Sequence, residues 1–130
     1  MNTKKIEVKR GDIVWLKEKV PYFTLGENVQ YTDRPYVVIS NNKNNDKAPT
    51  VNLACISKQV KKANYPMHVF LDKNKYNLNY YSVIFAEQLC TVNKSYIKEV
   101  VASLDSEDIK KFNRALFIQV IDEKVNKTVV

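Results

Sequence analysis

The sequence is poor in the residue types that several kinds of functional site require. It contains two glycines, Gly11 and Gly26, so it has no glycine-rich loop of the kind that cradles phosphates. Two cysteines, Cys55 and Cys90, are too few for a disulfide framework. These two cysteines and the single histidine, His68, are also not spaced in the pairs that a zinc site requires. The sequence therefore predicts neither a bound metal nor another cofactor.

Long apolar stretches are missing as well. No run approaches the roughly 20 residues that span a bilayer. The first ten residues have no apolar core, so they do not resemble a secretory signal. Together with the scarce cysteines, these features predict a cytoplasmic protein without a membrane partner.

What the sequence does contain is an ordinary globular composition. Of its 130 residues, 45% are hydrophobic and 27% are charged, which excludes disorder as the main state. There is no internal repeat and no linker rich in glycine or proline. We therefore expect a single domain over residues 1–130.

The net charge of +7 is concentrated in the middle of the chain. Residues 34–98 contain ten basic residues and three acidic ones, whereas the rest of the chain contains eleven of each kind. A basic segment of this kind is typical of proteins that bind a polyanion such as a nucleic acid. The alternative is a basic surface that serves solubility alone.

Short segments rich in β-branched and aromatic residues predict a strand-rich fold. The predicted strands are 12–17, 36–39, 50–57, 67–71, 81–86, 88–92 and 100–104. Short strands at near-regular spacing are typical of a compact barrel or a strongly bent sheet. The polar segment 41–47 is predicted to be a loop, and a long loop is expected over 18–33.

The C-terminal part of the sequence predicts a helix over residues 106–121. Asp105 or Ser106 can cap it, and Ile109, Phe112, Leu116 and Val120 recur at helical spacing. The expected fold is thus mainly β with one helix packed on the sheet. The wide apolar face of this helix fits either full burial or contact with a partner.

Five segments of the sequence resemble the MazF/PemK family of toxin endoribonucleases, in the family's order and at its approximate spacings. They are Val8-Lys9-Arg10-Gly11-Asp12-Ile13-Val14, Arg34-Pro35-Tyr36-Val37-Val38-Ile39-Ser40-Asn41, Ala48-Pro49-Thr50 leading to Cys55-Ile56-Ser57, Tyr65-Pro66-Met67-His68-Val69, and Ser82-Val83-Ile84-Phe85-Ala86-Glu87-Gln88-Leu89-Cys90-Thr91. The resemblance covers residues 8–121.

The resemblance implies a fold and an activity that composition and spacing do not. The implied fold is a small SH3-like β-barrel of the CcdB/Kid/PemK type with a C-terminal helix. The implied protein is a homodimeric toxin of a type II toxin–antitoxin system, neutralised by a cognate acidic antitoxin. It would cleave single-stranded mRNA at short sequences without metal, through attack of the RNA's own 2′-hydroxyl, leaving a 2′,3′-cyclic phosphate and a 5′-hydroxyl.

The resemblance also assigns catalytic roles. Arg34 matches the family's catalytic arginine, and its planar guanidinium suits two phosphate oxygens. Ser57 occupies the position of the catalytic threonine and retains the hydroxyl. Glu27 is a candidate general base. Each residue has a structural alternative. Arg34 could be an ordinary surface arginine, and Ser57 could bond the backbone at the end of a strand. Glu27 could be a solvated acid in a loop.

Further residues are predicted to contact RNA. They are Asn41, Asn45, Lys58, Lys61, Glu87, Gln88, Phe23 and Tyr31. Glu87 and Gln88 match a Glu-Gln pair that the family uses near the bound bases, although Glu87 could equally pair with a neighbouring lysine. His68 and Cys90 are expected to be structural, and Trp15 is expected in the core.

Two other functions compete with the nuclease. CcdB-like toxins share this fold and poison DNA gyrase by binding, but they depend on a tryptophan near the end of the chain, whereas the only tryptophan here is Trp15. A catalytically inactive RNA-binding homologue is the other alternative, since Ser57 and Cys90 replace the family's usual threonine and arginine.

Overall fold

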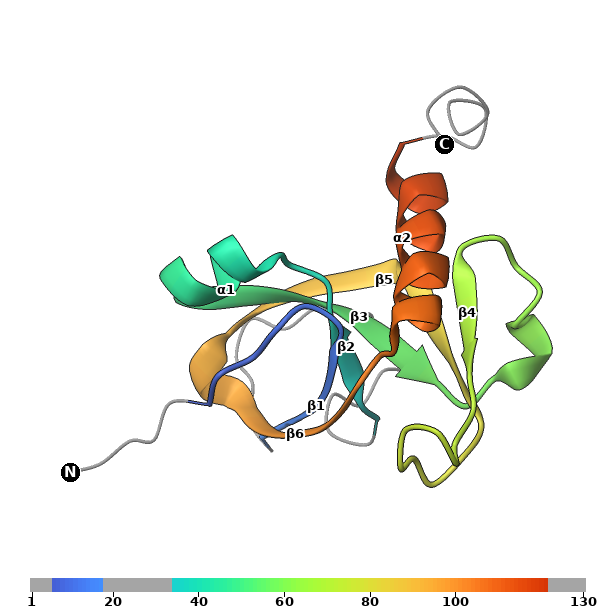
Figure 1. Ribbon diagram of the computed structural model, residues 1–130, viewed down its shortest axis with the longest axis horizontal. Coiled ribbons are helices and arrows are strands. Elements are labelled where there is room, and N and C mark those ends of the chain that lie inside the picture. Colours follow the sequence, from blue (N-terminus) through green and yellow to red (C-terminus); the bar gives the residue numbers. More distant parts are fainter. Residues whose placement is uncertain (1–5, 18–33, 122–130) are drawn as a thin grey trace.

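The computed structural model describes residues 6–17 and 34–121 as a single antiparallel sheet with one long helix (Figure 1). The strands are β1 Asp12–Leu16, β2 Tyr36–Val38, β3 Thr50–Ser57, β4 His68–Leu71, β5 Ser82–Asn93 and β6 Ile97–Ser103. The helices are α1 Asn42–Lys47, the 3₁₀ turns η1 Val60–Lys62 and η2 Lys94–Tyr96, and α2 Ser106–Val120.

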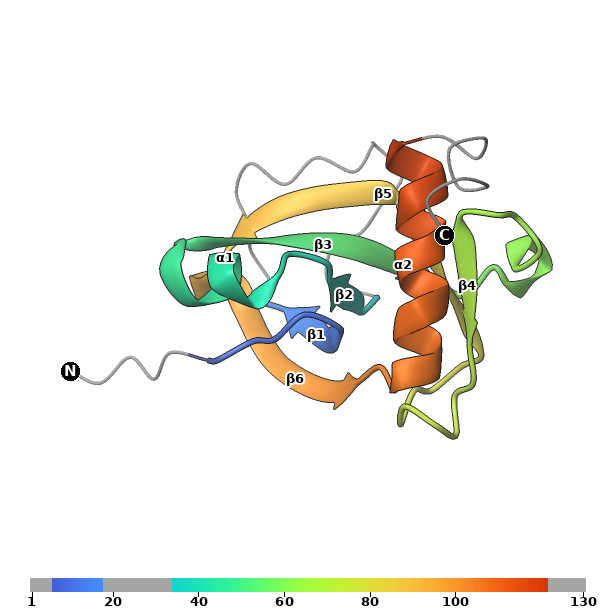
Figure 2. The ribbon, with the colours of Figure 1, turned by 45° about the horizontal axis from the view of Figure 1, so that its top comes forward.

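The strand order is β4-β5-β3-β2-β1-β6, with antiparallel pairing throughout. β4 and β6 are the two edges, so the sheet is bent but is not closed into a barrel. The mainly-β class with a C-terminal helix is confirmed, while the closed barrel is not seen in the described residues. The helix α2 packs against β4 and β5, and Figure 2 shows it next to both strands.

Both faces of the central strands are buried, which explains the continuous apolar run of β2. The helix-side core includes Val37, Ile56 and Ile84 together with Phe112 of α2. The second core lies on the opposite face and includes Tyr36, Val38 and Leu53. Because successive strand residues point to opposite faces, a strand between two cores is apolar at every position.

Two predicted element boundaries are wrong for identifiable reasons. The predicted strands 81–86 and 88–92 form one strand, β5, which bends at a bulge where residues 86–88 have no opposite residue on β3. The predicted loop 41–47 contains α1, because Asn41 caps this turn by accepting a hydrogen bond from the Asn44 amide at 3.0 Å.

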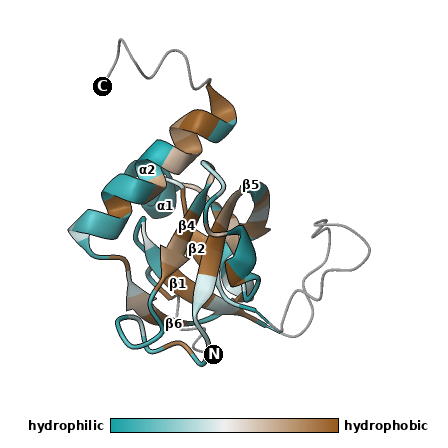
Figure 3. Ribbon diagram, turned by 90° about the vertical axis from the view of Figure 1, so that its right-hand side faces the viewer, coloured by the Kyte–Doolittle hydropathy of each residue, from teal (hydrophilic) through white to brown (hydrophobic). Residues whose placement is uncertain are grey.

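The helix α2 begins where the sequence predicts. The Asp105 side chain accepts a hydrogen bond from the Asp108 amide at 2.8 Å, and Glu107 and Asp108 lie in the first turn. Phe112 and Ala115 are buried against the sheet, whereas Val120 is 62% exposed. Full burial of the apolar face, one of the two alternatives for this helix, is therefore wrong, and Figure 3 shows an apolar C-terminal end of α2. None of the helices within residues 6–17 and 34–121 is long and apolar enough to cross a bilayer.

Gly11 lies in the turn before β1, where α2 approaches the sheet. Its φ of +90° is in a region that residues with a Cβ rarely adopt. A Cβ at this position would also lie 2.7 Å from Cδ1 of Ile109. The glycine of the first motif therefore has a structural explanation.

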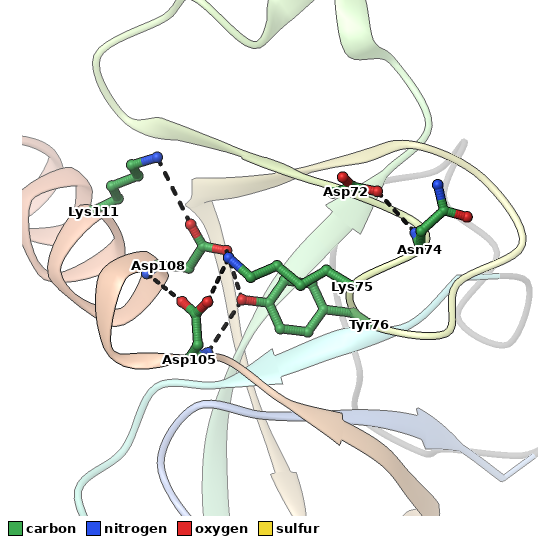
Figure 4. A network of polar contacts seen from close by, with 7 residues as sticks. All are labelled: Asp72, Asn74, Lys75, Tyr76, Asp105, Asp108 and Lys111. Atoms are coloured by element: carbon green, nitrogen blue, oxygen red, sulfur yellow. Dashed lines mark hydrogen bonds and ion pairs between the residues drawn. The ribbon is translucent and has the colours of Figure 1, made fainter.

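A polar network fastens the loop after β4 to the start of α2 (Figure 4). The Tyr76 hydroxyl donates a hydrogen bond to Asp108 at 2.5 Å and accepts one from the Asp105 amide at 3.1 Å. Lys75 pairs with Asp105, and this contact raises the pKa of Lys75 and lowers the pKa of Asp105. Burial, followed by the bond to Asp108, raises the pKa of Tyr76 to about 12.

Removing the Tyr76 hydroxyl should destabilise the fold, because Asp108 is only 5% exposed and would lose a buried partner. For Tyr76→Phe we expect the free energy of unfolding to fall by about 1–3 kcal/mol, measured by urea denaturation. Tyr65→Phe is the matched control, since Tyr65 is 51% exposed. Equal stability of the two variants would contradict the role given to the network.

Candidate RNA-cleavage site

Arg34 and Ser57 are directly opposite each other at one end of the sheet. The β2–β3 register pairs Tyr36 with Cys55 and Val37 with Ala54. The same register continues toward the start of β2, where the Ile56 amide donates to the Pro35 carbonyl at 3.2 Å. This register places Arg34 across from Ser57. The two residues form a non-hydrogen-bonded pair, which is the type of antiparallel pair in which opposite side chains are closest.

The Arg34 side chain is half-buried against the sheet, just before the start of β2. Its Nη1 lies 3.5 Å from the Sγ of Cys55, at the limit of a hydrogen bond to sulfur. Cys55 is fully buried in the second core. The contact is made by the guanidinium itself, so this group is oriented before any ligand binds.

A cavity of about 170 Å³ adjoins Arg34. Strand residues form one wall, and the loop that Tyr76 fastens forms the other. The lining residues are Trp15, Arg34, Pro35, Ile56, Lys58, Asn77, Leu78, Asn79, Tyr80 and Ser82. Trp15, expected in the core, is only half-buried and lines this cavity. The polarity and size of the cavity fit part of a nucleotide beside the guanidinium.

Ser57 is 3% exposed, and its Oγ accepts a hydrogen bond from the Gln59 amide at 3.1 Å. This contact is the backbone role that the sequence left open as an alternative. In this contact the hydroxyl oxygen acts only as an acceptor. The hydroxyl hydrogen is not used, because a serine hydroxyl can accept and donate at the same time. The group can therefore cap the turn after β3 and still donate one hydrogen bond to a phosphate oxygen.

Lys58 and Lys61 follow Ser57 on the segment that contains η1. Both are exposed, and Lys58 also lines the cavity beside Arg34. The Lys58 ammonium lies 4.6 Å from the centre of the Tyr80 ring. The structure thus brings together four of the predicted residues, Arg34, Ser57, Lys58 and Lys61, at one end of β2 and β3.

Glu87 lies in the β5 bulge and pairs with a histidine rather than with a lysine. Its carboxylate oxygens are 2.8 and 2.9 Å from Nε2 of His68. The Nδ1 of His68 lies 2.7 Å from the Lys62 carbonyl, which can only accept a hydrogen bond. Both ring nitrogens of His68 therefore face hydrogen-bond acceptors, which fixes the orientation of the ring.

The His68 side chain is only 1% exposed and is stacked between Tyr65 and Phe85, with ring centroids 5.0 and 4.2 Å apart. This environment confirms the structural role expected of His68. It also fixes the Glu87 carboxylate, which is 36% exposed and can still accept hydrogen bonds from outside the fold. The sequence could not reveal this pairing, because it depends on the register between β4 and β5.

The remaining predicted residues fall into three groups. The first contains Asn41, which is exposed and caps α1, and Asn45, which is 4% exposed and bonds Ser40. Asn45 is thus committed to the fold and is not presented to a ligand. The second is Gln88, whose buried Oε1 has no hydrogen-bond partner among the described residues. The third contains Glu27, Phe23 and Tyr31, which lie outside the described residues.

Cys90 has the inert character expected from the sequence. Burial, and secondarily the neighbouring Cys55, raises the pKa of its thiol to about 12. A thiol with such a pKa is a poor nucleophile at neutral pH, because the thiolate is the reactive form.

A larger cavity, of about 490 Å³, lies near the end of α1 and η2. Pro49, Asn93 and Ser95 are among its lining residues. Of the predicted site residues that the structure describes, none lines it. The candidate site is therefore placed at the smaller cavity because Arg34, Ser57 and two lysines lie together there, and not because of cavity size.

The chain is similar to known proteins both in sequence and in fold. Over 111 residues the chain is 37% identical to the Endoribonuclease MazF of Staphylococcus saprophyticus. The aligned segment covers 85% of this chain and 89% of that protein. Two solved structures share the fold at low identity. An endoribonuclease from a mycobacterial species has a TM-score of 0.68 at 15% identity, covering 88% of this chain and 92% of its own. A MazE-MazF structure from Deinococcus radiodurans has a TM-score of 0.65 at 17% identity, covering 91% and 100%.

The sequence also matches a defined protein family across most of its length. Residues 9–120 match the family described as PemK-like, MazF-like toxin of type II toxin-antitoxin system. These residues include every element of the sheet and the whole of α2. The chain therefore belongs to the PemK-like and MazF-like toxin family.

Proposed function

We propose that the protein is the toxin of a type II toxin–antitoxin pair and cleaves single-stranded mRNA at short sequences. Cleavage proceeds by attack of the substrate's 2′-hydroxyl on the adjacent phosphate, without a metal ion. The products are a 2′,3′-cyclic phosphate and a 5′-hydroxyl. The observation that carries this proposal is the placement of Arg34 across from Ser57, beside a cavity, in a chain of this family.

In this mechanism Arg34 stabilises the negative charge that develops on the phosphorane. A guanidinium presents donors in a fixed fork that matches two phosphate oxygens, and its high basicity makes it a poor proton acceptor. Its contact with Cys55 holds it in place before the substrate binds. Preorganised donors of this kind contribute most at the transition state, where the charge is greatest.

Ser57 supplies a second, neutral hydrogen bond to the same phosphate. The Gln59 amide fixes the position of its oxygen, which leaves the hydroxyl hydrogen for the substrate. Glu27 is our candidate for accepting the proton of the 2′-hydroxyl, and the departing 5′-oxygen takes a proton from water to become the 5′-hydroxyl. The substrate provides the nucleophile, so no nucleophilic side chain is required of the protein.

Base recognition is assigned to Glu87 and Gln88 in the β5 bulge. A carboxylate accepts hydrogen bonds from the amino groups of bases. The Oε1 of Gln88 is a second acceptor, which is buried and has no hydrogen-bond partner among the described residues. A bulge turns side chains away from the regular alternation of a strand. The lysines around the site contact phosphates and carry no sequence information.

Glu87→Gln should change the preferred cleavage sequence. A good base contact contributes about 1–3 kcal/mol of discrimination, so selectivity at one position of the RNA should relax about tenfold. Sequencing the ends of a cleaved transcript measures this preference. Glu99→Gln, in the exposed part of β6, removes the same charge elsewhere and should leave the preference unchanged. An unaltered sequence preference in Glu87→Gln would remove this residue from base recognition.

The partners follow from the same proposal. A solved mycobacterial endoribonuclease of this fold is bound to its cognate antitoxin. We assign this toxin an acidic antitoxin that covers the basic middle segment, and we place the toxin in the cytoplasm, where mRNA is found. The homodimer implied by the family resemblance stays a prediction. No observation favours gyrase poisoning, and the family match supports the nuclease over that alternative.

The proposal is tested by incubating the purified protein with a long transcript in the presence of EDTA. We expect discrete fragments that recur from one preparation to the next. An intact transcript under these conditions would contradict the proposed activity. Coexpression of the antitoxin gene should abolish both the cleavage and the arrest of growth that the toxin causes.

A further inference from the structure

An exposed pair of aromatic rings lies beside the proposed site, on the face of the sheet away from α2. Phe70 of β4 and Tyr81, just before β5, have ring centroids 5.9 Å apart and an interplanar angle of 15°. They are 47% and 44% exposed. Phe70 does not belong to the core, since its neighbours Val69 and Leu71 are the residues of β4 that enter the helix-side core.

The register of the sheet relates this pair to Ser57. Phe70 is opposite Val83 on β5, and Val83 is opposite Ser57 on β3. Phe70 and Ser57 are therefore in the same cross-strand row and on the same face, two strand spacings apart. Adjacent strands are about 4.8 Å apart, so this separation is roughly 10 Å, which a single-stranded nucleic acid covers with one or two nucleotides.

Lysines flank the exposed rings. The ammonium of Lys73 lies 5.3 Å from the centre of the Tyr81 ring. Lys58 lies over Tyr80, and both of these residues line the cavity beside Arg34. One lysine thus lies at the cavity beside Arg34, and another lies beside the exposed rings. The carboxylate of Asp72 is nearby, but it accepts a hydrogen bond from the Asn74 amide at 2.8 Å within its own turn.

We infer that Phe70 and Tyr81, with Lys73, form a stacking subsite for RNA bases on one side of the cleaved bond. This inference rests on the proposed function for the identity of the RNA as substrate. Flat rings stack on every type of base, and a neighbouring ammonium neutralises the phosphate of the same nucleotide. An acidic polypeptide would use the lysines but would not require two parallel exposed rings.

The test measures binding separately from cleavage. The probe is a fluorescein-labelled 12-nucleotide RNA of randomised sequence whose 2′-hydroxyls are replaced by 2′-O-methyl groups, so that it cannot be cut. Loss of one stacked base corresponds to about a tenfold weaker affinity. We expect Phe70→Thr combined with Tyr81→Thr to raise the Kd for this probe at least tenfold. Val120→Thr, on the exposed end of α2, is the control and should bind as the unsubstituted protein does.

A second arm uses RNA length. With cleavable RNA, the double variant should lose kcat/KM on a 12-nucleotide substrate and retain it on a substrate of four nucleotides centred on the cut. An unchanged Kd for the 12-nucleotide probe would overturn the subsite, even if the protein cleaves RNA normally. A defect confined to antitoxin copurification, or to sedimentation as a dimer, would also overturn it by showing a protein-binding face. Conversely, weaker probe binding without any cleavage by the unsubstituted protein would support the surface and contradict the proposed catalysis.

Discussion

Arg34→Ala should slow cleavage roughly a hundredfold to a thousandfold at saturating RNA, which is the usual effect of removing one preorganised donor at a developing anion. Arg34→Lys should recover only part of the rate, because an ammonium keeps the charge but loses the planar fork. The measurement is single-turnover cleavage of a mapped RNA in EDTA. Thermal unfolding of each variant is the control, since Arg34 also contacts buried Cys55.

Substitutions at Ser57 provide the comparison within the same site. Ser57→Ala should slow cleavage by less than Arg34→Ala, because one neutral hydrogen bond contributes about 0.5–1.5 kcal/mol. Ser57→Thr should remain active, since the hydroxyl is retained. A fully active Arg34→Ala protein would show that the phosphate is bound elsewhere.

The second large effect is the fall of RNA affinity with rising salt concentration. Five basic residues are candidates for phosphate contacts. Arg34 and Lys58 line the cavity, Lys61 and Lys62 belong to η1, and Lys73 lies over the Tyr81 ring. If all five contact phosphates, a single-stranded RNA gives a slope of log K against log salt of about −3.5. Affinity should therefore fall on the order of a hundredfold between 50 and 200 mM salt.

Lys58→Gln combined with Lys61→Gln should reduce this slope by about 1.4, so that the same change of salt weakens binding only about twentyfold. Lys94→Gln with Lys98→Gln removes the same charge from the region of η2 and β6 and should leave the slope unchanged. Fluorescence anisotropy of a labelled RNA measures both series. Equal slopes for the two double variants would mean that the basic residues act through net charge rather than through local phosphate contacts.

The positions of most strands and of α2 follow from local patterns in the sequence. Tyr36–Val38 is apolar at every residue because it lies between two cores, and Asp105 caps α2 as its residue type predicts. These signals depend on a few neighbouring residues, which is why they can be recognised without the fold. Asn41 was the exception, since its capping side chain converts a segment that looks like a turn into α1.

Pairings between distant residues could not be predicted in the same way. The contact of His68 with Glu87, and that of Tyr76 with Asp108, require a register or a loop path that no local pattern specifies. The same limit explains why β5 was divided into two strands at Glu87. The residues around Glu87 break the alternation of apolar and polar positions, but only the unbroken course of β3 shows that the break is a bulge.

The site was predicted by family resemblance rather than by pattern. Arg34 and Ser57 are 23 positions apart in the sequence, and neither has a neighbour that signals catalysis. The structure adds the physical reason for their pairing, which is the register that places them opposite each other. It also adds residues that the resemblance did not supply, namely the exposed rings of Phe70 and Tyr81.

The most direct test of metal-free cleavage at Arg34 is the chemical identity of the new RNA ends. A short RNA is cut to completion in EDTA, and the fragments are analysed by mass spectrometry. Attack by the 2′-hydroxyl predicts a 2′,3′-cyclic phosphate on the upstream fragment and a 5′-hydroxyl on the downstream one, with neither formed by Arg34→Ala in the same time. A 5′-phosphate on the downstream fragment, or cleavage only after magnesium is added, would contradict the mechanism.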